Sequence, residues 1–116
     1  MKLPGPDHPI SITPNPRRVN VLFQGQVVAE TTRALTLREA SYPAVQYIPR
    51  ADANMALYAK TERSTHCPYK GDASYYSLPG TGGENAVWSY EAPFPAMAEI
   101  AGHLAFYPNK VEITEA

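Results

Sequence analysis

The sequence predicts a mainly β domain, and three observations carry this prediction. Twelve prolines in 116 residues divide the chain into short pieces and leave little room for long helices. Several runs rich in β-branched and aromatic residues show the period of two that is typical of strands. Turn segments with glycine, proline and asparagine separate these runs. The length suits one domain, which can bury a core without disulfides.

The first sixteen residues differ in composition from the rest of the chain. They hold five prolines, so we expect an extended backbone with few hydrogen-bond donors. Two alternatives follow from this composition, a disordered tail or a segment pinned to the domain surface. We therefore divide the chain into a proline-rich lead-in, residues 1–16, and a single domain, residues 17–116.

The next segments read as short β elements. Val19, Val21 and Phe23 alternate with their neighbours and Gly25 marks a turn, so residues 19–28 predict a hairpin. Residues 32–43 either begin a short helix or form a strand that ends near Glu39. The run VQYIPR predicts a short strand stopped by proline. The following ADANMALY has helical propensity but covers barely two turns.

A second hairpin is predicted from Ala73–Leu78 and Ala86–Tyr90, joined by the turn PGTGGEN. Strand period places Tyr75 and Tyr76 on opposite faces and puts Trp88 on the same face as Tyr90. The segment APFPAMAEIAG is the best helix prediction, because its prolines lie at the start and Gly102 is placed to cap the end. The runs LAFY and VEIT predict two last strands.

Charge and composition exclude several classes of protein. The net charge is −1, with ten basic and eleven acidic side chains, so nucleic acid is not expected as a partner. No apolar run is long enough for a signal peptide or a membrane helix, so we expect a soluble cytoplasmic protein without a membrane partner. One cysteine excludes an internal disulfide.

The stretch STHCPYKGDASYY holds that cysteine and raises the question of catalysis. His66 is adjacent to Cys67, but neighbouring strand residues point to opposite faces, so the two should face apart. Lys70 could add positive charge, and the fold could bring in His103 after the predicted helix, whose dipole would favour a protonated ring. The alternatives are a small buried thiol and a reactive one. The candidate catalytic residues are Cys67, Lys70 and His103.

Metal and phosphate sites find less support. Cys67, His66 and His103 could supply mixed ligands, but no paired spacing of metal-binding residues occurs, so we predict no metal site. The glycines of GTGG lead into a predicted strand rather than a helix, which favours a hairpin tip over a phosphate loop. The sequence leaves open which cofactor, if any, the protein uses.

Aromatic residues are frequent in the second half of the chain. Such rings usually build a core, but tyrosine hydroxyls need partners when buried, and with nearby cations they could line a pocket for a flat small molecule. Arg50 has two interpretations: an ordinary surface arginine, or a cation in the pocket that binds an anionic ligand. The candidate ligand-binding residues are Arg50, Tyr69, Tyr75, Trp88, Tyr90 and Tyr107.

Long segments of the chain resemble the DUF427 family of unknown function, which also carries the label of a nucleotidyltransferase-like domain. The matching pieces are RALTLREASYPAVQYIPR, THCPYKGDASYYSL, AVWSYEAPFPAM and IAGHLAFYPNKVEI. The resemblance implies a β-tent-like domain, in which two short antiparallel sheets with one or two short helices lean over a pocket. Related folds such as methionine sulfoxide reductase B carry zinc on CxxC pairs, which this chain lacks. No carboxylate pair or phosphate loop supports nucleotidyl transfer.

Two functions from different classes follow. The first is a small-molecule-binding β domain, with or without catalysis, whose pocket lies among the THCPYKG segment, the aromatic strands and the step at His103. The second is a non-catalytic interaction module that forms a homodimer through an exposed hairpin edge. The substrate and the reaction stay open at this point.

Overall fold

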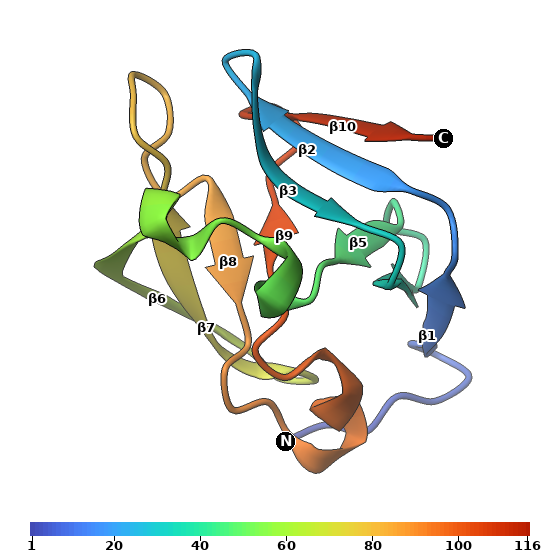
Figure 1. Ribbon diagram of the computed structural model, residues 1–116. Coiled ribbons are helices and arrows are strands. Elements are labelled where there is room, and N and C mark those ends of the chain that lie inside the picture. The colour runs from blue at the N-terminus through green and yellow to red at the C-terminus, as the bar shows by residue number, and fades with distance from the viewer.

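The computed structural model describes residues 1–116 and confirms a mainly β domain (Figure 1). The only helical segments are three short 3-10 helices. In chain order the elements are β1 (Ile10–Asn15), β2 (Val19–Phe23), β3 (Gln26–Thr31), β4 (Ala34–Glu39), β5 (Val45–Tyr47), η1 (Arg50–Asp52), η2 (Met55–Leu57), β6 (Ala59–Cys67), β7 (Gly71–Ser77), β8 (Val87–Ser89), η3 (Pro95–Ile100), β9 (Ala105–Phe106) and β10 (Glu112–Glu115).

The strands form three antiparallel sheets, one more than the two expected. Their strand orders are β1-β4-β5, β10-β2-β3 and β6-β7-β8-β9. Ile48 and Leu104 exchange two backbone hydrogen bonds of 2.8 Å, just beyond β5 and just before β9. This bridge joins the first and third sheets edge to edge, and β5 and β9 lie near each other at the centre of Figure 1. The seven joined strands make one curved surface.

The two faces of this curved surface build two separate hydrophobic clusters. Tyr76, Leu104 and Phe106 belong to the larger cluster, which includes buried residues of β2 and β3. Tyr75 and Ala105 belong to the smaller one on the other face. Tyr75 and Tyr76 are 4% and 6% exposed, so both are buried although they point in opposite directions. The predicted alternation in this strand is confirmed.

Both predicted hairpins are confirmed. β2 pairs with β3 around Gln24 and Gly25, and β7 pairs with β8 in a register that sets Tyr75 opposite Trp88. A further hairpin, β6–β7, carries the stretch that holds Cys67, with Cys67 opposite Gly71. The ambiguous segment after residue 32 forms β4, because its backbone pairs with strands on both sides.

The predicted short helix around Met97 is present, but it is a 3-10 helix rather than an α-helix. Residues 95–100 form η3, a 3-10 segment with a kink at Met97, where φ is −112° and ψ is 19°. Met97 and Ile100 are both buried in the smaller cluster, and the kink lets a short, proline-started segment present both of them. The segment ADANMALY likewise gives two 3-10 turns, η1 and η2. No helix here has the length and apolar content needed to cross a bilayer.

The lead-in contributes a strand to the fold. Residues 10–15 form β1, which pairs with β4 from Ile10 opposite Glu39 to Asn15 opposite Ala34. β1 is an edge strand, a position that tolerates the missing donor of Pro14. Further back, Lys2 donates its backbone N–H to the Pro68 carbonyl at 2.8 Å. The lead-in is therefore held against β4 and the β6–β7 turn, which favours the pinned alternative.

Candidate functional site

The smaller cluster surrounds a pocket of about 250 Å³, which we call the aromatic pocket. It lies on the inner face of the curved surface, where β4, β5, β7 and β8 contribute side chains. Eleven residues line it, and eight of them are hydrophobic: Leu37, Tyr42, Val45, Tyr47, Tyr75, Trp88, Tyr90 and Tyr107. The other three are Pro43 and the ion pair of Glu39 and Lys70.

Lys70 and Glu39 are the charged part of this wall. Lys70 comes from the β6–β7 turn, Glu39 ends β4, and the ammonium donates a hydrogen bond to Glu39 Oε1. Their side chains are only 8% and 15% exposed. Burial raises the pKa of Glu39, but hydrogen bonds from Lys70 and His8 outweigh burial and lower it below its usual value. The carboxyl group is therefore held in its charged form.

His8 engages the second oxygen of the same carboxylate. Its Nε2 lies 2.7 Å from Glu39 Oε2, and its ring stacks on Tyr69 with centroids 4.1 Å apart and planes 5° from parallel. The lead-in places His8 here because the Pro9 carbonyl accepts the backbone N–H of Ala40, next to Glu39. Both oxygens of Glu39 are thus occupied by partners from distant parts of the chain.

Cys67 lies beside the ion pair. Its Sγ is 3.8 Å from Lys70 Nζ, and its side chain packs against the smaller cluster. His66 points to the other face, where its Nδ1 lies 2.8 Å from Asp72 Oδ1 in solvent. The prediction that His66 and Cys67 face apart is confirmed, and the cation next to the thiol is Lys70.

Two hydroxyl groups of the aromatic wall, those of Tyr47 and Tyr90, are in different situations. Trp88 donates its indole N–H to the Tyr47 hydroxyl at 3.2 Å. Tyr90 is 7% exposed, and its hydroxyl is not fully enclosed by the chain. Tyr90 lines the pocket, and no hydrogen bond within the chain reaches its hydroxyl. Burial raises the pKa of Tyr90 well above its usual value, which keeps the phenol neutral.

A pair of linked tyrosines lies in the same pocket. The Tyr75 hydroxyl is 2.9 Å from Thr65 Oγ1 and 3.2 Å from the Tyr107 hydroxyl, and the Arg63 guanidinium lies 4.9 Å from the Tyr75 ring centre. Burial raises the pKa of Tyr75, but the hydrogen bonds with Thr65 and Tyr107 and the nearby charge of Arg63 lower it overall. Burial and the bond with Tyr75 raise the pKa of Tyr107 to about 12. Tyr75 is the more acidic of the two phenols.

The structure brings together most of the residues that the sequence singled out. Five of them line the aromatic pocket: Lys70, Tyr75, Trp88, Tyr90 and Tyr107. Cys67 and Tyr69 do not line the pocket themselves. Cys67 lies beside Lys70, and Tyr69 stacks on His8. Arg50 and His103 lie elsewhere, and neither contributes to this pocket.

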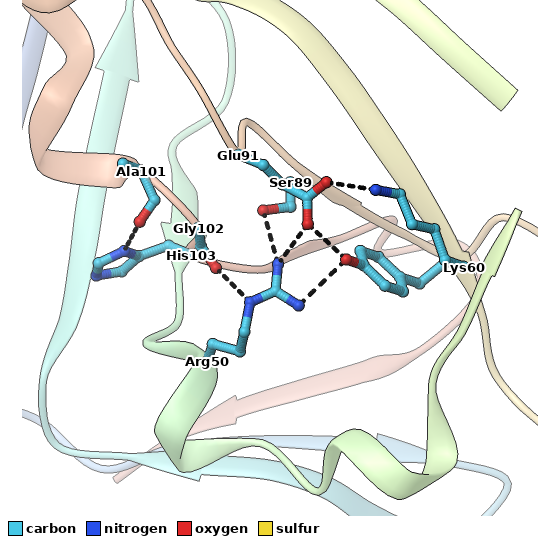
Figure 2. A network of polar contacts seen from close by, with 8 residues as sticks. Arg50, Lys60, Ser89, Glu91, Ala101, Gly102 and His103 are labelled. Atoms are coloured by element: carbon cyan, nitrogen blue, oxygen red, sulfur yellow. Dashed lines mark hydrogen bonds and ion pairs between the residues drawn. The ribbon is translucent and has the colours of Figure 1, made fainter. Parts of the chain in front are cut away.

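Arg50 is engaged inside the chain (Figure 2). Its guanidinium donates hydrogen bonds to four acceptors, the Gly102 carbonyl at 3.2 Å and the side chains of Tyr76 at 3.2 Å, Ser89 at 3.4 Å and Glu91 at 3.1 Å. Lys60 donates to the other Glu91 oxygen at 2.8 Å. Burial raises the pKa of Glu91, but the bonds led by Lys60 and Tyr76 lower it to about 2. This network ties η1 to β7 and β8.

His103 follows η3 and turns back on it (Figure 2). Its Nδ1 lies 3.2 Å from the Ala101 carbonyl oxygen. η3 is a kinked 3-10 segment of six residues, so His103 does not follow an α-helix whose dipole would favour a protonated ring. The geometry gives His103 no contact with Cys67 or Lys70.

Glu39 and Tyr47 of the pocket wall were missed in the sequence analysis, and so was His8, which contacts Glu39. Glu39 could have been found from the strand pattern, because Leu35, Leu37 and Glu39 lie on one face when residues 34–39 form a strand. An acidic residue at the end of an apolar face would have marked a buried carboxylate. His8 carried no comparable signal, since a stacked imidazole in a proline-rich lead-in depends on the path of the chain.

No group of three or more histidine, cysteine, aspartate or glutamate side chains is arranged to hold a metal ion. A family model described as a domain of unknown function, DUF427, matches residues 11–116. No curated protein matches the chain. The match covers every strand except the first residue of β1, so the pocket and its ion pair fall within the matched region, and His8 lies before it.

Proposed function

Since this chain belongs to the DUF427 family, whose function is unknown, we propose its function from its own pocket. The protein binds a small planar molecule that carries a hydrogen-bond acceptor. The ring lies between the aromatic side chains, and the acceptor meets the ammonium of Lys70.

The observation that carries this proposal is the ion pair of Lys70 and Glu39 in a pocket wall made mainly of rings. Buried ion pairs contribute little to stability compared with apolar side chains of the same size, so stability alone gives a poor reason for one here. An ammonium group has three donors. Glu39 takes one and the Cys67 sulfur lies near another, which leaves a donor for a ligand.

The pocket also limits the size and shape of the ligand. Its volume of about 250 Å³ falls just below the usual range of roughly 300–1,000 Å³ for ligand pockets. Trp88 and Tyr107 have ring centroids 4.6 Å apart and, together with Tyr47 and Tyr90, offer flat apolar faces. These features support a ligand of one or two rings. A reaction at this site would draw on the Cys67 thiol as a nucleophile and on the Lys70 ammonium as a proton donor.

Trp88 provides a direct test, because it is the only tryptophan and it lines the pocket. Its fluorescence is titrated with a panel of one-ring compounds, from phenol and benzamide to benzoate. We expect a saturable change with members that carry an acceptor. Val45→Phe fills the pocket and should abolish the change, while Val27→Phe, at a site 49% exposed, should keep it. A panel without effect, or binding that survives Val45→Phe, would reject the proposal.

The interaction module with a homodimeric edge receives less support. The strands β6 and β10 each lie at one edge of their sheets and carry exposed side chains. β6 carries Lys60, Glu62 and Arg63, and β10 carries glutamate at both ends. Charged edge strands discourage pairing with a second chain. Sedimentation over a range of concentrations would reveal a dimer if one forms.

A further inference from the structure

A second hollow lies beside the aromatic pocket, and the two share the side chain of Tyr107. The second hollow, which we call the polar hollow, has a volume of about 430 Å³. Tyr107 is its only hydrophobic residue, and the others are polar or charged: Arg63, Glu84, Asn85, Asn109 and Lys110. Tyr107 therefore borders both an apolar wall and a polar one.

The polar hollow carries more donors than acceptors. Arg63 is exposed and forms no ion pair with any carboxylate of the chain, and its guanidinium lies over the Tyr75 ring. Lys110 donates to the backbone carbonyl of Glu84 at 2.6 Å rather than to a carboxylate. With Glu84 as the one acidic residue, two cations and one anion give the hollow a formal charge of +1.

Asn85 adds a neutral donor. Its side-chain oxygen accepts a hydrogen bond of 2.6 Å from the Thr61 hydroxyl. Because the oxygen is occupied from this side, the amide N–H groups are the part of Asn85 left for a ligand. The residue is held in place by a second bond, from its backbone N–H to Ser77 Oγ at 2.9 Å. A guanidinium, an ammonium and a fixed amide thus border one space.

We propose that the polar hollow is an oxyanion subsite of the aromatic pocket. It takes the phosphate or carboxylate group of a ligand whose ring lies against Trp88 and Tyr107, and Arg63 makes the main contact. Arginine suits this role because its planar fork of donors matches an oxyanion in two parallel hydrogen bonds. The inference rests on the proposed function for the ring, and it adds the class of the ligand, an aromatic oxyanion.

The exposure of the hollow determines how such a ligand would bind. Charges in contact with water are screened, and the carboxylate of Glu84 opposes an anion. A free anion is therefore held weakly, and the ring supplies the larger part of the affinity. Joining the two groups in one molecule adds their contacts without a second loss of free motion.

The subsite is tested first by itself, with inorganic phosphate and nuclear magnetic resonance of the full chain. We expect shifts of the side-chain signals of Arg63 and Asn85 that saturate and weaken with added salt. Arg63→Gln should remove the shift at Asn85. Arg18→Gln changes the charge equally at an exposed site outside both pockets and should leave that shift intact. Equal shifts in both variants would overturn the subsite.

The link between the two sites is tested with phenol and phenyl phosphate, read by Trp88 fluorescence. We expect phenyl phosphate to bind about tenfold more tightly than phenol, and Arg63→Gln to remove this gain without weakening phenol. If phenol binds and the phosphate group adds nothing, the subsite is rejected while the aromatic pocket stands. If phosphate shifts Asn85 but neither aromatic compound reaches Trp88, the proposed function fails and with it the assignment to an aromatic oxyanion.

Discussion

Lys70 donates a hydrogen bond to Glu39 from 31 positions further along the chain, and both side chains face a pocket lined mainly by rings. The pair connects the β6–β7 turn to the end of β4, two segments of different sheets. It also fixes the position of the one ammonium group in the pocket wall. The ion pair is therefore both a link between sheets and the feature on which ligand binding is proposed to depend.

Removing one member of this ion pair should lower the free energy of unfolding more than removing both members. Lys70→Met leaves the carboxylate of Glu39 with His8 as its only partner, and we expect a loss of about 3 kcal/mol in the free energy of unfolding. The double variant Glu39→Gln with Lys70→Met carries no uncompensated charge and should lose less. Denaturant unfolding measures both. Equal losses would mean that the charge of Glu39 is not the cause.

The network of Figure 2 predicts a dependence of stability on pH. The pKa of Glu91 is about 2 in the folded protein against an ordinary value of 4.5, so folding favours its charged form. Its contribution is complete above about pH 5 and is lost as the pH falls towards 2. The stability difference between the wild type and Glu91→Gln should be constant near neutral pH and shrink on acidification. A difference that stays constant down to pH 2 would contradict this assignment.

The Tyr76 hydroxyl should contribute more to the free energy of unfolding than an ordinary tyrosine hydroxyl. It donates to Glu91 at 2.6 Å and accepts from Arg50 at 3.2 Å, and hydrogen bonds to charged groups contribute about 1.5–3 kcal/mol. Tyr76→Phe should lower the unfolding free energy by about 2 kcal/mol. Tyr69→Phe is the matched control, because it keeps the ring stacked on His8 and removes a hydroxyl without a partner in the chain. Similar losses in both variants would show that the network adds nothing.

The pocket geometry predicts which hydroxyl and imidazole matter for binding. Tyr90 lines the pocket and its hydroxyl has no partner in the chain, whereas His103 lies outside the pocket and faces the Ala101 carbonyl. For a compound selected by Trp88 fluorescence, Tyr90→Phe should weaken binding by about three- to tenfold, and His103→Ala should leave it unchanged. Circular dichroism confirms that each variant is folded. Loss of binding in His103→Ala alone would move the site away from this pocket.

The strand content could be predicted because it depends on local patterns. The alternation of a strand in ASYYSL places Tyr75 and Tyr76 on opposite faces, and each side chain is buried in a different hydrophobic cluster. The hairpin turns follow from glycine at positions such as Gly25, whose φ is +81°. An aromatic pocket that includes Tyr75, Trp88 and Tyr90 was predicted from the same strands, and the register that sets Tyr75 opposite Trp88 places these rings on one face.

The errors arise where contacts distant in sequence decide the outcome. Nothing local in APFPAMAEIAG distinguishes an α-helix from the kinked η3, which is fixed by burying both Met97 and Ile100. The sequence allowed two interpretations of Arg50, a surface residue or a pocket cation. Its four acceptors come from distant parts of the chain, so only the tertiary structure brings them together.

The sequence by itself determined a mainly β chain, two of its hairpins, the opposite directions of His66 and Cys67, and the rings that gather on one face. These features follow from the period of a strand and from turn residues, which act over a few positions. Only the tertiary structure decided that Glu39 and His8 meet Lys70, that His103 lies outside the pocket, and that Tyr107 separates an apolar space from a polar one. Such meetings depend on how the sheets join through Ile48 and Leu104, and no local pattern encodes that junction.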